Sequence, residues 1–202
     1  MYRMLLLCMM MVVCAVQQLR GAGRDTTSFA GIRLKTTAGR MMSMGTVRDA
    51  KAAVFVLLAP ECPISQQCTG ELNRLAVEYT KIGVVFYGVF PGDYYSVEEV
   101  AEFGKKYQVN FPLLVDDAYT LTNNLGGIVT PEVFVLNSRF AIVYSGAIDN
   151  AYLELGRKSA RVTGHYLADA LAAVVKGSVV TVPRTRPIGC LVEQPKAMAN
   201  GK

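Results

Sequence analysis

One cysteine lies where a polypeptide can activate a thiol. Cys62 follows the apolar run of residues 52–58 and precedes Pro63, and a helix beginning near Ser65 would place it at the helix N-terminus. Unpaired amides and the helix dipole favour an anion there, so a thiolate is stabilised and its pKa falls. Pro63 suits the first turn of a helix because it has no amide hydrogen. The negative charge of the adjacent Glu61 disfavours a thiolate, but the sequence does not determine which way the Glu61 side chain points.

A second feature lies far away in the sequence. Thr130 and Pro131 directly precede the apolar run of residues 133–136. Peptide bonds before proline are the ones that readily adopt the cis form. A cis proline before a strand can turn a backbone amide and carbonyl toward a nearby site, and the order and spacing of this pair relative to Cys62 give it weight.

The N-terminus is typical of a targeting element. Arg3 precedes an unbroken apolar run of residues 4–16, which is shorter than the roughly 20 residues that cross a bilayer. We therefore expect a signal peptide over residues 1–22 and an exported, periplasmic or extracytoplasmic protein. An uncleaved anchor or a buried first helix is the alternative. Cys14 follows Val13 rather than a small residue, so lipid anchoring there is not expected.

Composition favours one globular domain with a sizeable core. The chain has 202 residues, of which 51% are hydrophobic. The net charge is +5, but Arg3 and Arg20 fall in the first twenty residues and the remaining basic residues are scattered among acids. This pattern excludes a nucleic-acid footprint. We expect membrane contact only through the signal segment.

The rest of the chain alternates strand and helix. Short apolar runs predict strands at residues 52–58, 84–90, 111–115, 133–136 and 140–144. Apolar residues at helical spacing, or capping residues, predict helices that include residues 72–79, 96–107, 117–125 and 167–174. In the second of these helices Ser96 and Glu99 form a capping box. In the third, Asp117 is the expected cap and Gly126 the stop.

The domain boundaries follow from composition. Residues 23–44 have little periodicity and predict an irregular lead-in, with one short strand near residues 32–34. Residues 45–178 form the predicted domain. The tail, residues 179–202, is rich in Pro, Arg and Thr and carries Cys190.

Together these features resemble the thioredoxin-like fold, in the redoxin branch related to the alkyl hydroperoxide reductase and thiol-specific antioxidant family. The resemblance covers residues 45–150 and rests on Cys62-Pro63-Ile64-Ser65 at a helix start and on Thr130-Pro131 before a hairpin. It implies a three-layer α/β/α sandwich with a mixed central sheet and a C-terminal tail. It also implies that Cys62 is the nucleophile and that Thr130 and Pro131 orient the substrate. The tail from Thr185 to Cys190 looks like that of exported bacterial redoxins.

The chain departs from two patterns of that fold. Thioredoxins carry Trp-Cys-x-x-Cys, whereas this chain has no tryptophan and has Ser65 at the second cysteine position. Peroxiredoxins use Pro-x-x-x-Thr-x-x-Cys, whereas here Pro60 lies two residues before Cys62 and no threonine is in place. Neither constellation therefore carries over intact. The candidate substrate-binding residues are Pro63, Ser65, Thr130 and Pro131.

Cys62 then needs another partner. Without the signal segment, which holds Cys8 and Cys14, the cysteines are Cys62, Cys68 and Cys190. On a helix Cys68 would lie about 240° around the axis from Cys62 and roughly 9 Å along it. That exceeds the limit of about 7 Å between the Cα atoms of a disulfide. The tail has no such restriction, so a Cys62–Cys190 pair is favoured. Cys62–Cys68, Cys68–Cys190 and no bridge remain open.

Three functions remain open. The first is an exported thiol-disulfide oxidoreductase or thiol peroxidase-like protein, in which Cys62 attacks a protein disulfide or a peroxide and Cys190 resolves the product. The second is a redox-inactive binding module with a structural disulfide. The third is a copper metallochaperone-like protein.

No cofactor or resident metal is expected. The expected partners are protein thiols or disulfides, or a peroxide, and a redox partner protein. His165, the only histidine, is expected at the surface near the start of its helix. Asp116 and Asp117 are read as a helix cap, and Tyr94 and Tyr95 as the cover of a loop near the sheet edge.

Overall fold

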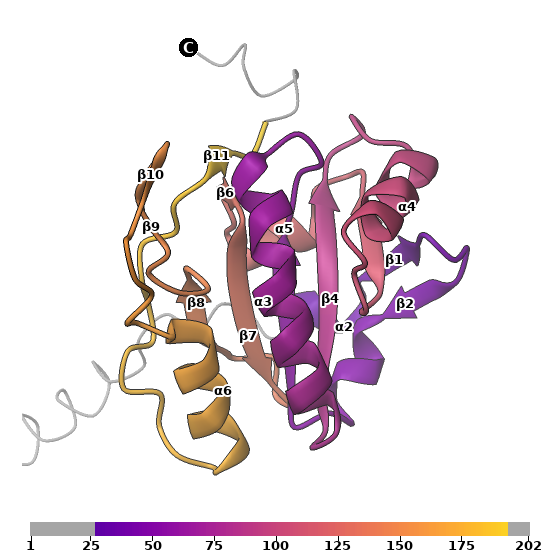
Figure 1. Cartoon of the computed structure of the whole chain (residues 1–202). Helices are drawn as coiled ribbons and strands as arrows, with labels where there is room; N and C mark the ends of the chain where they lie inside the picture. The colour runs from indigo at the N-terminus through magenta and orange to yellow at the C-terminus, as the bar shows by residue number, and fades with distance from the viewer. Residues whose placement is uncertain (1–26, 194–202) are drawn as a thin grey trace, which may run out of the picture.

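The computed structural model describes residues 27–193, so the predicted signal segment and Cys14 lie outside the described residues. A seven-stranded sheet in the order β2-β1-β5-β4-β3-β7-β8 forms its centre (Figure 1). Its strands are β1 (Arg33–Thr36), β2 (Met41–Ser43), β3 (Ala52–Leu57), β4 (Val84–Pro91), β5 (Leu113–Asp116), β7 (Glu132–Asn137) and β8 (Ile142–Gly146). Two small sheets pair β6 (Val129–Thr130) with β11 (Cys190–Leu191), and β9 (Tyr152–Glu154) with β10 (Arg157–Lys158).

Helices cover both faces of the sheet. The helical elements are α2 (Thr27–Ala30), η1 (Met44–Val47), α3 (Pro63–Thr80), α4 (Val97–Lys106), α5 (Thr120–Leu125) and α6 (Tyr166–Val175). Helices α3, α4 and α6 lie in front of the sheet in Figure 1, and α2 and α5 lie behind it. The predicted three-layer α/β/α sandwich is confirmed. Within residues 27–193, none of the helices is both long and apolar enough to cross a membrane.

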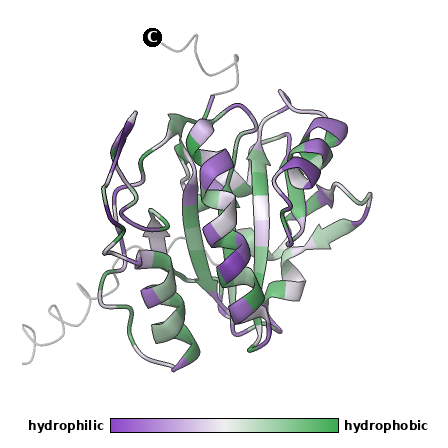
Figure 2. Ribbon diagram, in the orientation of Figure 1, coloured by the Kyte–Doolittle hydropathy of each residue, from purple (hydrophilic) through white to green (hydrophobic). Residues whose placement is uncertain are grey.

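Strand β3 shows why the sheet has two cores. All six of its residues are buried, as its unbroken apolar sequence predicts for a strand covered on both faces. Val54 and Val56 pack with the apolar side of α3, whereas Phe55 and Leu57 pack with α5. The strand runs parallel to β4 and antiparallel to β7, so the sheet is mixed. Figure 2 shows the hydrophobic residues concentrated on these central strands.

The short strand predicted near residues 32–34 is found as β1, but the rest of the lead-in is less irregular than predicted. Strands β1 and β2 form an antiparallel pair, and β1 also pairs with β5, so both belong to the main sheet. Leu34 and Met42 lie opposite each other and are buried, while their neighbours face outward. Each strand is only three or four residues long, and the alternation of buried and exposed residues is therefore too short to predict a strand pair from the sequence.

The end of β5 also differs from its prediction. Asp117 is exposed and accepts a hydrogen bond only from the adjacent amide of Ala118. The buried residue Asp116 instead caps α5. Its carboxylate accepts hydrogen bonds from the amide of Leu121 at 3.2 Å and from the amide and hydroxyl of Thr122, both at 2.7 Å. Gly126 ends the helix in the left-handed conformation, as predicted.

We expect Asp116→Ala to lower the free energy of unfolding by about 3 kcal/mol, because two buried amides and a hydroxyl lose their acceptor. Asp117→Ala is the matched control and is expected to change it by less than about 0.5 kcal/mol. Urea unfolding of both variants measures the difference. Equal losses would contradict the assignment of Asp116 as the cap.

The remaining predicted elements are confirmed. Ser96 and Glu99 form the capping box of α4, with bonds of 3.2 Å and 2.8 Å. Strands β7 and β8 form the antiparallel hairpin. Helix α6 packs against these two strands through Leu167 and Leu171, which are buried.

The tail is attached to the domain before it reaches Cys190. It runs beside β8, where the backbones of Ser145 and Thr185 are hydrogen bonded at 3.0 Å. The Thr185 hydroxyl lies 2.6 Å from the Tyr144 hydroxyl and accepts the amide of Ala147 at 2.9 Å. A Cβ at Gly146 would overlap Thr185, so this glycine permits the close approach.

Candidate redox site

The connection from β3 to α3 positions Cys62. Cys62 is the N-cap of α3 and Pro63 is its first helical residue, so the helix begins where the sequence predicts. The Cys62 amide donates to the Ala59 carbonyl at 3.2 Å, and the Ala59 amide donates to the buried Ser65 hydroxyl at 3.3 Å. Only 1% of Cys62 is exposed, whereas Pro63 lies at the surface. These contacts hold the thiol at the helix N-terminus.

Two distant segments meet the Cys62 thiol. The Thr130-Pro131 peptide bond is cis, and the Cys62 thiol donates to the Thr130 carbonyl at 3.1 Å. The Cys190 thiol lies 3.1 Å from the Cys62 sulfur and donates to it. The structure therefore brings together Cys62, Thr130, Pro131 and Cys190. All three described cysteines are free thiols.

Strand β11 carries Cys190 to this place (Figure 1). Cys190 lies opposite Thr130 in the pair that β11 forms with β6, and the amide of Val192 donates to the Ile128 carbonyl at 2.9 Å. A Cβ at Gly189 would overlap the Thr130 carbonyl. Glycine at this position therefore lets the tail approach the Thr130-Pro131 peptide.

The two thiols are not equivalent. Burial raises the pKa of Cys62, but hydrogen bonds from Cys190 and from the backbone and hydroxyl of Ser65 offset it, and the net pKa is below that of an ordinary thiol. Burial and the contact with Cys62 raise the pKa of Cys190 to about 11, and the charge of Glu61 adds to this. Cys62 is therefore the more acidic thiol of the pair, and the Cys190 thiol donates a hydrogen bond to its sulfur.

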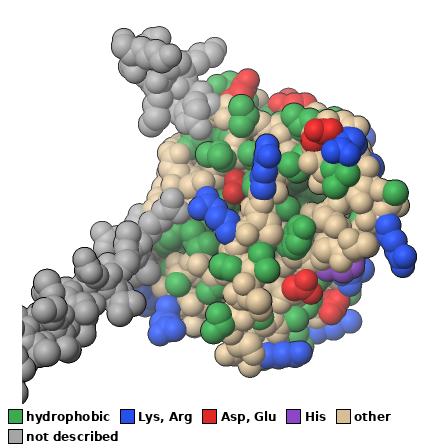
Figure 3. Space-filling view, turned by 90° about the vertical axis from the view of Figure 1, so that its left-hand side faces the viewer, with side chains coloured by type: hydrophobic (Ala, Val, Ile, Leu, Met, Phe, Trp, Pro, Cys, Tyr) green, Lys and Arg blue, Asp and Glu red, His purple; other side chains and the backbone are tan. Residues whose placement is uncertain are grey.

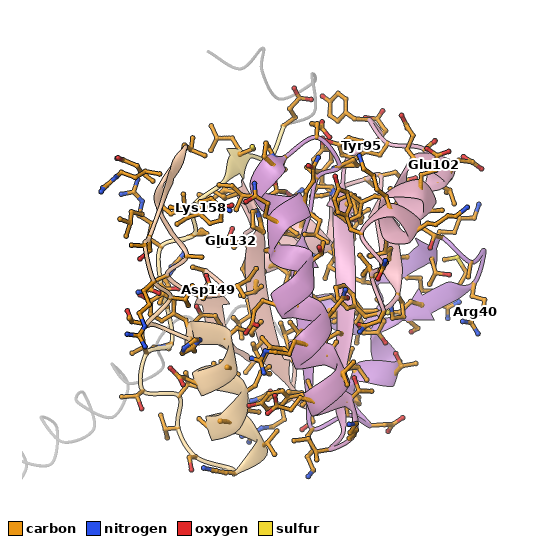
Figure 4. All side chains as sticks on the ribbon, viewed as in Figure 1. Arg40, Tyr95, Glu102, Glu132, Asp149 and Lys158 are labelled. Carbon is orange, nitrogen blue, oxygen red and sulfur yellow. The ribbon has the colours of Figure 1, made fainter. Side chains whose placement is uncertain are left out.

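One contact shows where the side chain of Glu61 points, which the sequence left open. The Tyr95 hydroxyl donates to the Glu61 carboxylate at 2.6 Å, and Figure 4 shows Tyr95 near the start of α4. Burial and this carboxylate raise the pKa of the Tyr95 hydroxyl. Sequence reasoning assigned Tyr95 only to a loop cover and missed the contact, because no local pattern links residues 34 positions apart.

Cys68 points elsewhere. Its thiol donates to the Ser65 carbonyl of its own helix at 3.2 Å. Burial raises its pKa, and the charges of Cys62 and Asp149 add to the effect. The structure thus places Cys190, and not Cys68, in contact with Cys62, as the geometry of a helix predicts.

One hollow borders the thiol pair and a second lies nearby. One of about 210 Å³ reaches Cys62 and Cys190 and is also lined by Thr130, Tyr95 and Glu193. The other, of about 280 Å³, lies on the α3 side of Pro131 and is lined by Ile64, Cys68 and Ile188 among others. Asp149 and Lys158 also line this second hollow; Lys158 comes from β10, and Figure 4 labels both residues on the side of α3 where β9 and β10 lie. The sequence carried no signal for either hollow.

The described part of the chain contains no set of side chains that could form a copper site. Over residues 27–193, the His, Cys, Asp and Glu side chains form no group of three that could hold a metal ion. His165 is exposed at the N-cap of α6, as predicted.

The different acidities of the thiols can be measured. The part of the thiolate absorbance that is present in the wild type and missing in Cys62→Ser belongs to Cys62. We expect this absorbance to titrate with a pKa below that of an ordinary thiol, because hydrogen bonds favour the anion. In Cys190→Ala this pKa should rise, because one donor is removed. Ultraviolet titration of the reduced variants, with Cys68→Ser as the control, reports both values. An unchanged pKa in Cys190→Ala would show that the Cys190 contact has no electrostatic effect.

Comparisons with known proteins agree with this fold. The AhpC/TSA family model matches residues 26–151. No curated protein matches the chain. A hypothetical protein of Sinorhizobium meliloti is similar, with a TM-score of 0.74, 25% identity, and 83% of this chain and 93% of that chain covered.

Two further structures share the fold. An uncharacterized conserved protein of Geobacillus kaustophilus has a TM-score of 0.74, 24% identity, and 83% and 91% of the two chains covered. A secreted disulfide oxidoreductase of Mycobacterium tuberculosis, homologous to DsbE of E. coli, has a TM-score of 0.55 at 17% identity, with 71% and 96% covered. The described domain is thus a thioredoxin-like α/β domain.

Proposed function

Because the chain belongs to the AhpC/TSA family of thioredoxin-like redoxins, we propose that it is a thiol-disulfide oxidoreductase with Cys62 as nucleophile and Cys190 as resolving thiol. The observation that carries the proposal is the 3.1 Å contact between these two sulfurs at the N-terminus of α3. Their unequal acidities support the same assignment, since the thiolate is the attacking form.

The reaction has two exchange steps. The Cys62 thiolate attacks a substrate disulfide, so one sulfur of the substrate becomes bonded to Cys62 and the other leaves as a thiolate. Cys190 then loses its proton to solvent or to that leaving thiolate and attacks the Cys62 sulfur. The second substrate sulfur leaves, the substrate is reduced by two electrons, and a Cys62–Cys190 disulfide forms. A dithiol reductant must restore the pair.

Four other residues support these steps. Ser65 holds the loop before the helix through the Ala59 amide and stabilises the thiolate. Pro63 lies exposed beside the thiol, and the Thr130 carbonyl contacts its sulfur. We assign Pro63, Thr130 and Pro131 to substrate positioning, because Pro63 adjoins Cys62 in the chain and the Thr130-Pro131 segment contacts its sulfur through the Thr130 carbonyl.

Peroxide reduction receives less support from the charges of the site. Cleavage of an O–O bond leaves a hydroxide or alkoxide, which is more basic than a thiolate and needs stronger stabilisation. The described residues that line the hollow over Cys62 include Glu61 and Glu193 but no Lys or Arg. Their negative charges disfavour an oxyanion, and so disulfide exchange is the better match to this site.

A comparison of two substrates tests the proposal. The reduced protein is mixed with insulin or with an alkyl hydroperoxide, and the oxidation of the Cys62–Cys190 pair is followed in a single turnover. We expect faster oxidation by the protein disulfide. If the hydroperoxide oxidises the pair faster, the protein is a thiol peroxidase. If neither substrate reacts, the domain is a redox-inactive binding module.

Export is a further part of the proposal. An exported redoxin would work where disulfides persist, and this setting suits a chain whose working form carries a cysteine pair. The similar mycobacterial oxidoreductase is a secreted protein. Its partners would be protein disulfides and a dithiol-carrying redox protein. N-terminal sequencing of the mature protein tests export, and a chain that begins at Met1 in the cytoplasmic fraction would contradict it.

A further inference from the structure

Strand β11 stands apart from the main sheet. It pairs with β6 alone, in a two-stranded antiparallel sheet directly before Pro131. Its cysteine is half-buried, and Leu191 is 78% exposed. It is therefore an extended, cysteine-bearing segment that lies on the surface of the domain and presents a thiol to Cys62.

We infer that β11 is a tethered occupant of the place beside β6, and that an extended, cysteine-bearing segment of a partner protein must replace it there to react with Cys62. The inference rests on the proposed function and names its substrate class. The backbone of β6 offers the same hydrogen bonds to any extended segment, since a strand pair is made by backbone groups. Side chains then decide which segments bind.

Space at the thiol requires replacement rather than simultaneous binding. Gly189 approaches the Thr130 carbonyl so closely that even a Cβ would overlap it. Cys62 is 1% exposed, and its sulfur contacts the Thr130 carbonyl and the Cys190 sulfur. A partner sulfur that attacks or is attacked at Cys62 must take the place that Cys190 holds.

The way in which the tail is attached allows β11 to separate from β6 and to pair with it again. Strand β11 has only two residues, so its separation breaks a short strand pair and exposes one buried side chain, Val192. Thr185, four residues before Gly189, is attached to Tyr144, Ser145 and Ala147 by hydrogen bonds. This attachment keeps Cys190 at high effective concentration near Cys62 after β11 separates. Return of β11 would expel the partner strand and deliver the resolving thiol in one movement.

The surroundings of β6 suit a protein better than a small molecule. Ile128 and Leu155, which are 58% and 63% exposed, line a hollow beside the strand pair together with Leu191. Figure 3 shows the side of the molecule that carries β9 and β10, where hydrophobic side chains lie scattered over the surface. Ile128 and Leu155 remain when β11 leaves and can pack against side chains of the partner.

The test separates strand pairing from thiol chemistry in the full-length chain. Cys190→Ser keeps β11 but removes its thiol. Cys190→Ser with Gly189→Ala adds the Cβ that overlaps Thr130 and so displaces β11. Cys190→Ser with Gly70→Ala is the matched control, because a Cβ at Gly70 meets nothing within 4 Å. Amide hydrogen exchange at Val192, which donates to Ile128, verifies displacement of the strand.

Three probes are compared for their rate of disulfide formation with Cys62. The first is a peptide that copies residues 186–193, with its cysteine as a mixed disulfide with thionitrobenzoate. The second is the same peptide with an N-methyl group at the position of Val192, which removes that donor. The third is hydroxyethyl disulfide, which has no backbone and reports access to Cys62 alone.

We expect the rate for the first peptide, divided by that for hydroxyethyl disulfide, to rise about tenfold when Gly189→Ala is added, because the site is freed. The methylated peptide should gain much less, and Gly70→Ala should change nothing. An unchanged ratio, or an equal gain for both peptides, would overturn the inference while the proposed function stands. Failure of hydroxyethyl disulfide to react in every variant would overturn both.

Discussion

Cys62→Ser is expected to lower disulfide reductase activity at least about a thousandfold, because no other described thiol occupies the N-terminus of α3. Cys68 cannot substitute for it, since its thiol donates to a carbonyl of its own helix and its pKa is raised by burial. Insulin reduction with dithiothreitol as the electron donor measures the loss.

Cys68→Ser is the matched control for this variant and should retain activity close to that of the wild type. Both substitutions remove one sulfur from α3, so a general effect on the helix would appear in both. Thermal unfolding verifies that the two variants remain folded. Activity that survives in Cys62→Ser, or is lost in Cys68→Ser, would contradict the assignment of the nucleophile.

Cys190→Ser is expected to separate the two exchange steps. Cys62 can still attack a disulfide, so the first step continues, but the product remains bonded to Cys62 because the resolving thiol is missing. We expect steady-state turnover to fall about a hundredfold while a mixed disulfide accumulates. Intact mass spectrometry after a single mixing with a peptide disulfide detects the adduct.

The outcome of this variant distinguishes a resolving role from a structural one. If Cys190 only completed the fold, the variant would lose stability and form no more adduct than the wild type. If an external thiol resolves Cys62 efficiently, turnover would remain near that of the wild type. Either result would remove Cys190 from the catalytic pair and leave Cys62 as the only redox-active cysteine.

Much of the framework could be predicted from local sequence. The strand before Cys62 is continuously apolar, and Pro63 marks a helix start, so the position of the thiol at the start of α3 follows from adjacent residues. The resemblance to thioredoxin-like redoxins implied that Thr130 and Pro131 lie beside Cys62, and the Thr130 carbonyl contacts the Cys62 sulfur. Helix geometry disfavoured Cys68 as a partner without any knowledge of the tertiary structure.

Other features depend on contacts that no local pattern records. Asp116 and Asp117 are neighbours of the same type, and burial alone decides that Asp116 caps α5. The contact that turns Glu61 toward Tyr95 joins segments from different parts of the chain. The pairing of β11 with β6 involves two residues on each strand, which is too few for a periodic signal.

The central claim is that Cys62 and Cys190 form the redox-active pair, and disulfide mapping of the full-length protein tests it most directly. The protein is equilibrated in buffers of increasing glutathione disulfide, free thiols are blocked, and the peptides are identified by mass spectrometry. We predict one reversible intramolecular disulfide, between Cys62 and Cys190, with Cys68 free throughout. A disulfide between Cys62 and Cys68, or a Cys62 thiol that stays reduced under oxidising conditions, would contradict the account.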